Sequence, residues 1–448
     1  MQNIKQRGLS IDGMLAVIQA GGKGTRIRDL TNDEIPKPLL RLNNKTLLQW
    51  QIETIKRYGI KEFAIIIGHQ GDKIRKTFGD GSDYGISINY IEEHTPMGSA
   101  GSLYFLKDYS FSDVLLVFCD IMFDMDLNRL IKFHKKNNSL LTLVAHPNSH
   151  PYDSDIIQVD NDGRVLNILG KNETRTEWFG NLVNAGIFIF DKRIIDKIET
   201  PRKLDLEKDI IDNLLRTRRV FAYKTSEYIK DVGTPERFET ASFEQKNGIW
   251  KQKNLEKKQR CIFLDRDGTL NKFVGYISDS NQLELEDEAA EAIKMINESG
   301  FLAILITNQP VVARGLCTEN DVRIIHNKLE TLLGESRAYL DDISFCPHHP
   351  DKGFEGENIQ YKVMCKCRKP QIGMILRMQE KYNIDLNESW YVGDTTTDVM
   401  TGINAGMHTV LLRTGEGGKD NKFDVKPDLK AENIKIAVVE ILKRSKMN

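Results

Sequence analysis

Residues 15–26 read Leu-Ala-Val-Ile-Gln-Ala-Gly-Gly-Lys-Gly-Thr-Arg, a short apolar run that ends in a glycine-rich turn. An apolar run of this length, bounded by glycines, is typical of a buried β-strand. Glycines that follow a strand let backbone N–H groups approach phosphate oxygens, and Arg26 adds a positive charge. An ordinary tight turn carries the same glycines, so this turn by itself leaves both interpretations open.

Beyond this turn the chain alternates strand-like apolar runs with helical patterns. The apolar runs cover 63–67, 114–118 and 140–145, and the helical patterns cover 47–58 and 127–137. Alternation of this kind predicts a mostly parallel sheet covered by helices.

The alternation stops at a polar stretch, 245–260, and then restarts. We expect strands over 261–264, 301–306 and 390–392, and helices over 286–299 and 431–443. At 448 residues the chain exceeds what one hydrophobic core usually organises. We therefore predict an α/β protein of two domains, residues 1–244 and 260–448, joined by a helical or irregular linker over 245–259.

The overall charge excludes some classes of partner. The chain has 63 Lys and Arg against 64 Asp and Glu, so its net charge gives no general electrostatic attraction to nucleic acid or to an anionic membrane. No apolar stretch reaches the length of a membrane span, and the start over residues 1–5 lacks the apolar core of a signal peptide. We expect a cytoplasmic protein that binds small phosphorylated substrates through local basic residues; a homo-oligomer is left open.

A second basic element follows the glycine-rich turn. Pro36-Lys37-Pro38 is a rigid turn that could present Lys37 to the same phosphates. A Gly-Gly-x-Gly-Thr-Arg loop followed by Pro-Lys-Pro resembles the sugar-nucleotide pyrophosphorylases, over about residues 14 to 240. The resemblance implies a Rossmann-like nucleotidyltransferase domain whose loop binds the nucleotide through Gly21, Gly22, Gly24 and Thr25.

Four further segments match the same family in order. The resemblance assigns a base contact to Gly98 and Ser99 in the segment 96–101, and a sugar contact to Asn184 and Gly186 in the segment 184–186. It also assigns Mg²⁺ ligation to Asp120 and Asp231 and a sugar-phosphate contact to Lys171. Taken singly, each aspartate also suits a strand end or a turn, and Lys171 also suits a solvated lysine.

The residue types fit the chemistry that this family implies. A sugar 1-phosphate oxygen attacks the α-phosphorus of a nucleoside triphosphate and pyrophosphate leaves. A cation must offset the charge that gathers on the phosphoryl oxygens. Asp120 and Asp231 would hold that cation, while Arg26 and Lys37 neutralise the remaining charge.

The second half opens with a strand that delivers two carboxylates, Asp265 and Asp267, just beyond its C-terminal end. Open α/β sheets carry their chemistry at that edge. Asp265 would attack phosphorus to form an aspartyl phosphate, and Asp267 would protonate the departing alcohol and later activate water.

This arrangement resembles the haloacid dehalogenase superfamily of phosphatases, whose other motifs follow in order. The resemblance assigns Thr307 to steady the phosphoryl group, Lys369 to supply the cation and Asp394 to bind magnesium together with Asp265 and Asp267. It implies a second Rossmann-like domain. A chance run of unrelated acidic turns is the alternative.

Three cysteines and a histidine crowd into one segment of the second half. Cys346 and His348 form one pair, and Cys365 and Cys367 form the other. Three thiols and an imidazole match a tetrahedral, structural Zn²⁺ site. Idle thiols are the alternative, and His349 is the competing imidazole.

The zinc loop narrows the resemblance within the phosphatase superfamily. Together with Asp-Arg-Asp-Gly-Thr and the Asn308-Gln309 pair, it resembles the heptose bisphosphate phosphatases, with the histidinol phosphatases as relatives. Asn308 would then line the substrate site. Arg314 and Arg368 would bind a second, non-reacting phosphate through paired hydrogen bonds, although each also suits an exposed arginine.

Joined together, the two resemblances imply consecutive reactions. Removal of the 7-phosphate from D-glycero-D-manno-heptose 1,7-bisphosphate leaves a heptose 1-phosphate, which a pyrophosphorylase requires. We expect guanylyl transfer from GTP to the α-anomer, giving GDP-heptose. Adenylyl transfer to the β-anomer, hexose-1-phosphate transfer beside an unrelated phosphatase, and one half that serves only binding or assembly are the alternatives.

Overall fold

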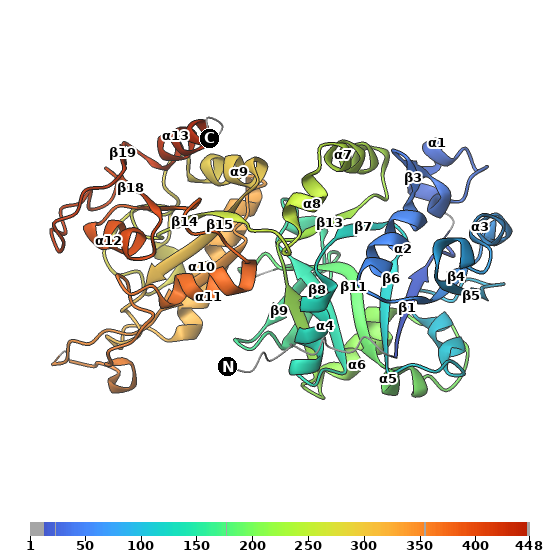
Figure 1. Cartoon of the computed structure of the whole chain (residues 1–448). Coiled ribbons are helices and arrows are strands. Elements are labelled where there is room, and N and C mark those ends of the chain that lie inside the picture. Colours follow the sequence, from blue (N-terminus) through green and yellow to red (C-terminus); the bar gives the residue numbers. More distant parts are fainter. Residues whose placement is uncertain (1–12, 23, 176, 354, 446–448) are drawn as a thin grey trace, which may run out of the picture. The chain divides into compact units, whose positions relative to one another are not determined.

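The computed structural model describes residues 13–22, 24–175, 177–353 and 355–445 (Figure 1). The start over residues 1–5, on which the signal-peptide prediction depends, lies outside this part of the chain, as does Lys23 of the glycine-rich turn. The chain divides into two compact units. The first contains residues up to 145, 157–168 and 184–254, and the second contains 146–156, 169–183 and the chain from 255 onward.

A nine-stranded sheet organises the first half of the chain, with β10-β9-β11-β6-β1-β4-β5 as its main path and with β8 joining β12 to β11. A two-stranded pair, β7 with β13, lies outside it. The strands are β1 (Met14–Gln19), β2 (Arg41–Leu42), β3 (Lys45–Thr46), β4 (Glu62–Ile67), β5 (Ser87–Glu92), β6 (Asp113–Phe118), β7 (Ile121–Asp124), β8 (Leu141–His146), β9 (Ile156–Val159), β10 (Val165–Leu169), β11 (Val183–Asp191), β12 (Val220–Lys224) and β13 (Tyr228–Asp231).

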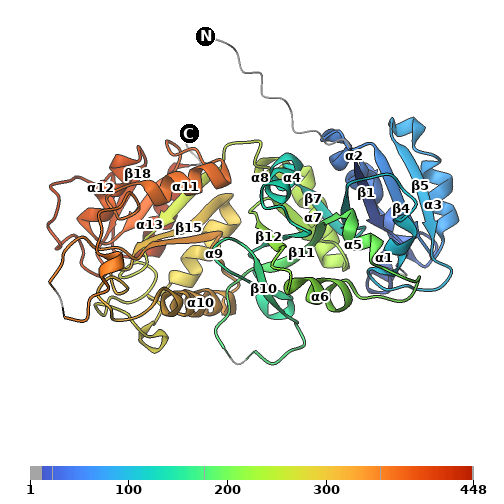
Figure 2. The ribbon, with the colours of Figure 1, turned by 90° about the horizontal axis from the view of Figure 1, so that it is seen from below.

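The parallel part of this sheet follows the predicted alternation. Strand β1 pairs in parallel with β4 and β6, β4 pairs in parallel with β5, and β8 does so with β12. Figure 2 shows β1, β4 and β5 side by side. Strand β11 runs antiparallel to both β6 and β9, so the sheet is mixed. A reversed strand of this kind is common in large sheets.

Helices cover the faces of this sheet because alternate residues of each strand point to opposite sides. Met14, Ala16 and Ile18 of β1 share one buried cluster with side chains of α2, α3 and α4. The helices of the first unit are α1 (Arg28–Thr31), α2 (Leu47–Arg57), α3 (Gly71–Phe78), α4 (Leu127–Lys136), α5 (Lys192–Asp196), α6 (Asp212–Leu215), α7 (Pro235–Lys246) and α8 (Ile249–Lys253).

The stretch predicted as a linker is folded over much of its length. Helix α8 lies within it, and Trp250 is buried with its ring stacked on Tyr228 at 4.8 Å between centroids. Asn254 is also buried and donates to Asp124 Oδ1 at 2.7 Å, inside the first unit. The next residue, Leu255, belongs to a core cluster of the second unit.

A six-stranded sheet organises the second unit, in the order β16-β15-β14-β17-β18-β19, and neighbouring strands run parallel. Its strands are β14 (Arg260–Leu264), β15 (Phe301–Asn308), β16 (Asp342–Cys346), β17 (Trp390–Gly393), β18 (His408–Leu412) and β19 (Leu429–Ala431). Its helices are α9 (Ala289–Ser299), α10 (Glu319–Glu335), α11 (Gly373–Tyr382), α12 (Thr396–Asn404) and α13 (Ile434–Arg444).

Two boundaries in this unit differ from the sequence expectation. Helix α9 begins at Ala289 and not at 286, because Glu288 has a left-handed backbone (φ 64°) that cannot continue a helix. Strand β19 was not predicted, and its residues delay the start of the last helix to Ile434.

The sheet of the second unit is covered on both faces. Ile262 and Leu264 of β14 pack with α9, α10 and α13, while Cys261 and Phe263 pack with α11 on the opposite face. Because β14, β15 and β17 are adjacent and parallel, the residues at their C-terminal ends meet at one edge of the sheet.

Candidate active sites

The glycine-rich turn of the first unit follows β1 directly. Ala20 N–H donates to Ile66 O at 2.8 Å, and a single turn of 3₁₀ helix, Thr25–Ile27, begins after Gly24, which has φ 63°. A Cβ added to Gly22 would meet no atom within 4 Å. The backbone at Gly22 therefore faces open space, as a phosphate-binding turn requires.

Two aspartates lie beside this turn. Asp120 follows β6, and the pairing of β7 with β13 brings Asp231 next to it, with Val232 N–H donating to Asp120 O at 2.8 Å. Lys37 is only 8% exposed, and its Nζ lies 2.8 Å from Asp120 Oδ2. The predicted aspartates and Lys37 therefore converge from three separate segments.

Arg26 spans both carboxylates. Its guanidinium nitrogens lie 3.7 Å from Asp120 Oδ2 and 3.9 Å from Asp231 Oδ2. Arg237, in the first turn of α7, pairs with Asp231 at 3.0 Å and was not predicted. Its signal was its position six residues after Asp231, just beyond Gly233-Thr234-Pro235. Two carboxylates among three cationic side chains form a site suited to a metal ion and an anionic ligand.

The segments predicted to contact the base and the sugar are tied into the fold. Gly98 has φ 76°, and a Cβ there would lie 2.4 Å from Leu204 O. Ser99 Oγ accepts a hydrogen bond from Leu206 N–H at 2.7 Å. The close approach of two backbone segments is thus a structural reason for Gly98 and Ser99, and their base contact stays a prediction.

Asn184 is held in a similar way. Its Nδ2 donates to Glu207 Oε1 at 2.9 Å, and its Oδ1 accepts from Gly186 N–H at 3.1 Å. Lys171 is exposed and lies in a hollow of the second unit beside Tyr152 and Arg175. The sugar contact of Asn184 and Gly186 and the phosphate contact of Lys171 stay predictions.

Glu93 is a carboxylate beside the glycine-rich turn that the sequence analysis did not single out. It follows β5, and its Oε2 would lie 3.0 Å from a Cβ added to Gly21. Its Oε1 accepts hydrogen bonds from Gln19 Nε2 at 3.3 Å and from Ser102 Oγ. An acceptor therefore stands where a bound nucleotide would meet the turn.

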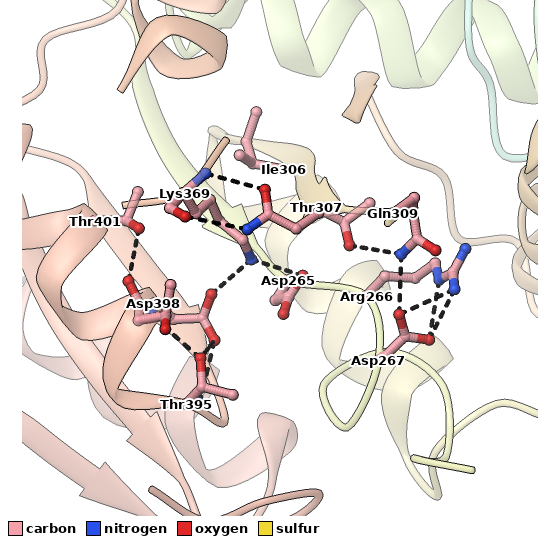
Figure 3. Close-up of polar contacts among 12 residues, drawn as sticks. Asp265, Arg266, Asp267, Ile306, Thr307, Gln309, Lys369, Thr395, Asp398 and Thr401 are labelled. Atoms are coloured by element: carbon pink, nitrogen blue, oxygen red, sulfur yellow. Dashed lines mark hydrogen bonds and ion pairs between the residues drawn. The ribbon is translucent and has the colours of Figure 1, made fainter. Parts of the chain in front are cut away.

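In the second unit, Asp265 follows β14 and faces Lys369 (Figure 3). Lys369 Nζ lies 2.8 Å from Asp265 Oδ1 and 2.6 Å from Asp398 Oδ1. Asn308 fixes the backbone of this lysine, accepting from Lys369 N–H at 3.0 Å and donating to its carbonyl at 3.2 Å. Asn308, predicted to line the substrate site, thus positions Lys369.

Three carboxylates form a cluster at this sheet edge. One oxygen each of Asp265, Asp394 and Asp398 lies within 4.8 Å of the others. Burial, with the neighbouring carboxylates, raises the pKa of Asp394 to about 8, and burial raises that of Asp265 to about 6 although Lys369 opposes the shift. A divalent cation would relieve this crowding of charge. Asp398 was missed, although its position four residues after Asp394 in the same motif could have indicated it.

The carboxylate of Asp267 does not join that cluster. Arg266 Nη2 donates to both of its oxygens, at 2.9 Å each. Gln309 Nε2 donates to Oδ2 at 3.0 Å, and Asn271 Nδ2 donates to Oδ1 at 3.1 Å. In Figure 3 this group lies on the opposite side of Asp265 from Asp398. The side chain predicted as a magnesium ligand therefore points elsewhere.

Two glycines lie in close contact with the carboxylate of Asp394. A Cβ would lie 2.4 Å from Asp394 Oδ2 if added to Gly268 and 2.1 Å if added to Gly415. The same oxygen accepts from Glu416 N–H at 2.7 Å. The loop after β18 thus holds the carboxylate in place by a contact that only glycine permits.

The cysteine and histidine ligands predicted for zinc come together. The ligand atoms of Cys346, His348, Cys365 and Cys367 lie within 4.8 Å of one another, with Sγ to Sγ distances of 3.2 to 3.6 Å. Among the described residues this group contains His348 and not His349. Edges of this length fit four ligands around one tetrahedral ion.

The two arginines predicted for a second phosphate occupy different environments. Arg314 lies over the ring of Tyr276, 4.8 Å from its centroid, and Tyr276 is half exposed. Arg368 Nη1 donates to His348 O at 3.1 Å, which ties it to the loop that carries the cysteine and histidine cluster. Their phosphate contact stays a prediction, and Tyr276 is an aromatic neighbour that the sequence analysis missed.

Comparisons with known proteins agree with this division. The family model described as nucleotidyl transferase matches residues 15–247, just over half of the chain. The D-glycero-β-D-manno-heptose-1,7-bisphosphate 7-phosphatase of Yersinia pestis is 39% identical over 157 residues, which are 35% of this chain and 81% of that protein. The chain belongs to the nucleotidyl transferase family in its first half and to the family of this phosphatase in its second. It is thus an enzyme with nucleotidyltransferase and phosphatase activities.

Other matches fit this fusion of a nucleotidyl transferase and a phosphatase. The model described as HAD-hydrolase-like matches residues 366–437. The mannose-1-phosphate guanylyltransferase of Mycobacterium tuberculosis is 30% identical over 237 residues, and the chain spans 65% of its length.

Among solved structures, a D,D-heptose 1,7-bisphosphate phosphatase from B. bronchiseptica with magnesium and phosphate is 27% identical, at a TM-score of 0.37, over 42% of this chain and 99% of its own. Within the described part of the fusion enzyme, no helix has the length and apolar character to cross a bilayer.

Proposed function

We propose that the fusion enzyme catalyses two consecutive steps in the synthesis of a nucleotide-activated heptose. The phosphatase half removes the 7-phosphate of D-glycero-D-manno-heptose 1,7-bisphosphate, and the transferase half moves GMP from GTP to the resulting heptose 1-phosphate. The observation that carries the proposal is that one chain joins relatives named for a heptose bisphosphate and for mannose 1-phosphate. Both names specify a manno-configured sugar, and the product of the first reaction is a sugar 1-phosphate.

The phosphatase geometry supports an aspartyl-phosphate mechanism. Asp265 attacks phosphorus, the bond from phosphorus to O7 breaks, and Asp267 gives its proton to the departing alcohol. Water then attacks the aspartyl phosphate while Asp267 takes its proton, and inorganic phosphate leaves. Lys369, 2.8 Å from Asp265, and the hydroxyl of Thr307 would contact the phosphoryl oxygens. Mg²⁺ held by the three-carboxylate cluster would offset the charge of the transferring group.

The transferase geometry supports in-line attack on a nucleoside triphosphate. A sugar-phosphate oxygen bonds to the α-phosphorus, and pyrophosphate takes the electrons of the broken bond. Lys37 and Arg26, which now pair with Asp120, are within reach of the phosphates that would lie on the glycine-rich turn. Mg²⁺ held by Asp120 and Asp231 would neutralise the leaving pyrophosphate.

The proposal also assigns the ions and the setting. The Cys₃His cluster takes a structural Zn²⁺, because three thiolates and an imidazole are the ligands that this ion prefers. Both reactions use small phosphorylated substrates, and we propose that they take place in the cytoplasm.

The test supplies the purified enzyme with Mg²⁺ and each anomer of the heptose bisphosphate in turn. We expect phosphate release, followed on addition of GTP by pyrophosphate release and a product with the mass of GDP-heptose. Pyrophosphate release should be faster with GTP than with ATP, and faster with the α-anomer than with the β-anomer. Faster phosphate release from histidinol phosphate, or pyrophosphate release with hexose 1-phosphates only, would overturn the heptose assignment.

A further inference from the structure

Arg266 stands between the two aspartates of the phosphatase half and has no assigned role. Its side chain is fully buried, although burial of a guanidinium is costly unless it is paired. Its Nη2 lies 2.9 Å from each oxygen of Asp267, and its Nε lies 3.1 Å from Oδ1 (Figure 3). The guanidinium therefore contacts both carboxylate oxygens through two of its nitrogens, which fixes the orientation of the carboxylate.

Other donors complete this hold on Asp267. Gln309 Nε2 donates to Asp267 Oδ2 and to Thr307 Oγ1, both at 3.0 Å, and Asn271 Nδ2 donates to Oδ1 at 3.1 Å. Behind the guanidinium, His326 of α10 lies with its Nε2 3.5 Å from Arg266 Nη1. The Asp267 side chain nevertheless stays 20% exposed, so one side of it is open to a substrate.

We propose that Arg266 is a positioning residue that keeps Asp267 aimed at the leaving group and away from the metal ligands. Asp267 is two residues from Asp265, and an unrestrained carboxylate would be drawn toward a divalent cation held by Asp265, Asp394 and Asp398. The guanidinium offers a competing cation in a fixed place. The inference rests on the proposed proton-transfer role of Asp267.

The consequence depends on the leaving group. An alkoxide, such as O7 of a sugar, leaves slowly unless it receives a proton, whereas p-nitrophenolate leaves without one. A misplaced Asp267 therefore slows formation of the aspartyl phosphate from a sugar phosphate far more than from p-nitrophenyl phosphate. A merely structural loss of Arg266 would slow both substrates alike.

The experiment measures single-turnover formation of the aspartyl phosphate in the full chain. Arg266→Met should lower the rate with the heptose bisphosphate by about 100-fold, as for a displacement of about 1 Å, and with p-nitrophenyl phosphate by less than about tenfold. Arg266→Lys keeps the charge without the paired geometry, so its rate with the heptose bisphosphate should lie between those of the unchanged enzyme and Arg266→Met. Nucleotidyl transfer should be unchanged in both variants, because its glycine-rich turn and aspartates lie in the first unit, and thermal unfolding of the full chain reports on the folding of the second unit.

Two controls separate the possible failures. Asp267→Asn should show the same dependence on the leaving group; if it slows both substrates equally, the proton-transfer role itself is wrong. Arg377→Met, which removes another arginine of this unit that donates to Ser344, should change neither rate. If Asp267→Asn discriminates between the substrates while neither Arg266 variant does, the positioning inference is overturned. If Arg266→Met does not fold, the outcome for Arg266→Lys decides.

Discussion

Replacing Gly415 with alanine should disable the phosphatase half by displacing one carboxylate. The added Cβ would lie 2.1 Å from Asp394 Oδ2, whereas ordinary contact begins at 3.4 Å, so one of the two must move by about 1.3 Å. Gly268 lies 2.7 Å from the same Cβ, which leaves the loop little room to retreat. A displacement of about 1 Å at a reacting site lowers a rate by about 100-fold, and we expect that loss in kcat for phosphate release.

A second effect of this change is backbone strain, which needs its own control. Gly415 has φ 56°, a left-handed conformation that costs alanine about 1 kcal/mol in the free energy of unfolding. Gly406 has φ 71° and no atom closer than 3.8 Å to an added Cβ. Gly406→Ala therefore carries the strain without the clash, and should lose stability but keep its phosphatase activity.

The assay compares phosphate release and its Mg²⁺ dependence in both glycine variants, with thermal unfolding alongside. Gly415→Ala should need more Mg²⁺ for half-maximal activity, because Asp394 belongs to the carboxylate cluster. Nucleotidyl transfer by the same protein should be unaffected. If Gly415→Ala releases phosphate within twofold of Gly406→Ala, the close packing of this loop does not hold Asp394 in a productive place.

Three further predictions concern the separate sites. Asp265→Asn should abolish phosphate release and spare nucleotidyl transfer, and Asp120→Asn should do the reverse; loss of both activities in either folded variant would contradict independent sites. Cys367→Ser should lower the unfolding temperature and the zinc content measured by metal analysis, and an unchanged zinc content would argue against the Cys₃His site. The pKa of Asp394, raised by burial to about 8 from 3.8, means that the metal-free fold binds its proton more tightly than the unfolded chain does. The contribution of Asp394 to stability without metal should therefore be full below pH 3.8 and be lost as the pH rises to about 8, so Mg²⁺ should raise the unfolding temperature more at pH 8 than at pH 5; an equal rise at both would refute this.

Local sequence patterns were enough to predict many of the strands and helices. Short apolar runs located β1, which glycines flank, and β14, which ends just before Asp265, because such runs bury a strand whatever surrounds them. The same reasoning failed where backbone conformation or sheet order mattered. Nothing in the run over 183–191 indicates that β11 is antiparallel, and the polar composition of 245–260 hides the buried Trp250.

The amino-acid sequence by itself determined which chemical groups the enzyme carries: the glycine-rich turn with Lys37, the two carboxylates after β14 and the paired thiols. Motifs of this kind are continuous in the chain, so their spacing reports on chemistry directly. Which groups meet was decided only by the tertiary structure. The contact of Lys369 with Asp398, the hydrogen bond from Gln309 to Asp267 and the closeness of Glu93 to Gly21 join residues that are 29 to 72 positions apart. Such contacts depend on strand order and register, which arise from packing of the whole sheet and leave no local trace in the chain.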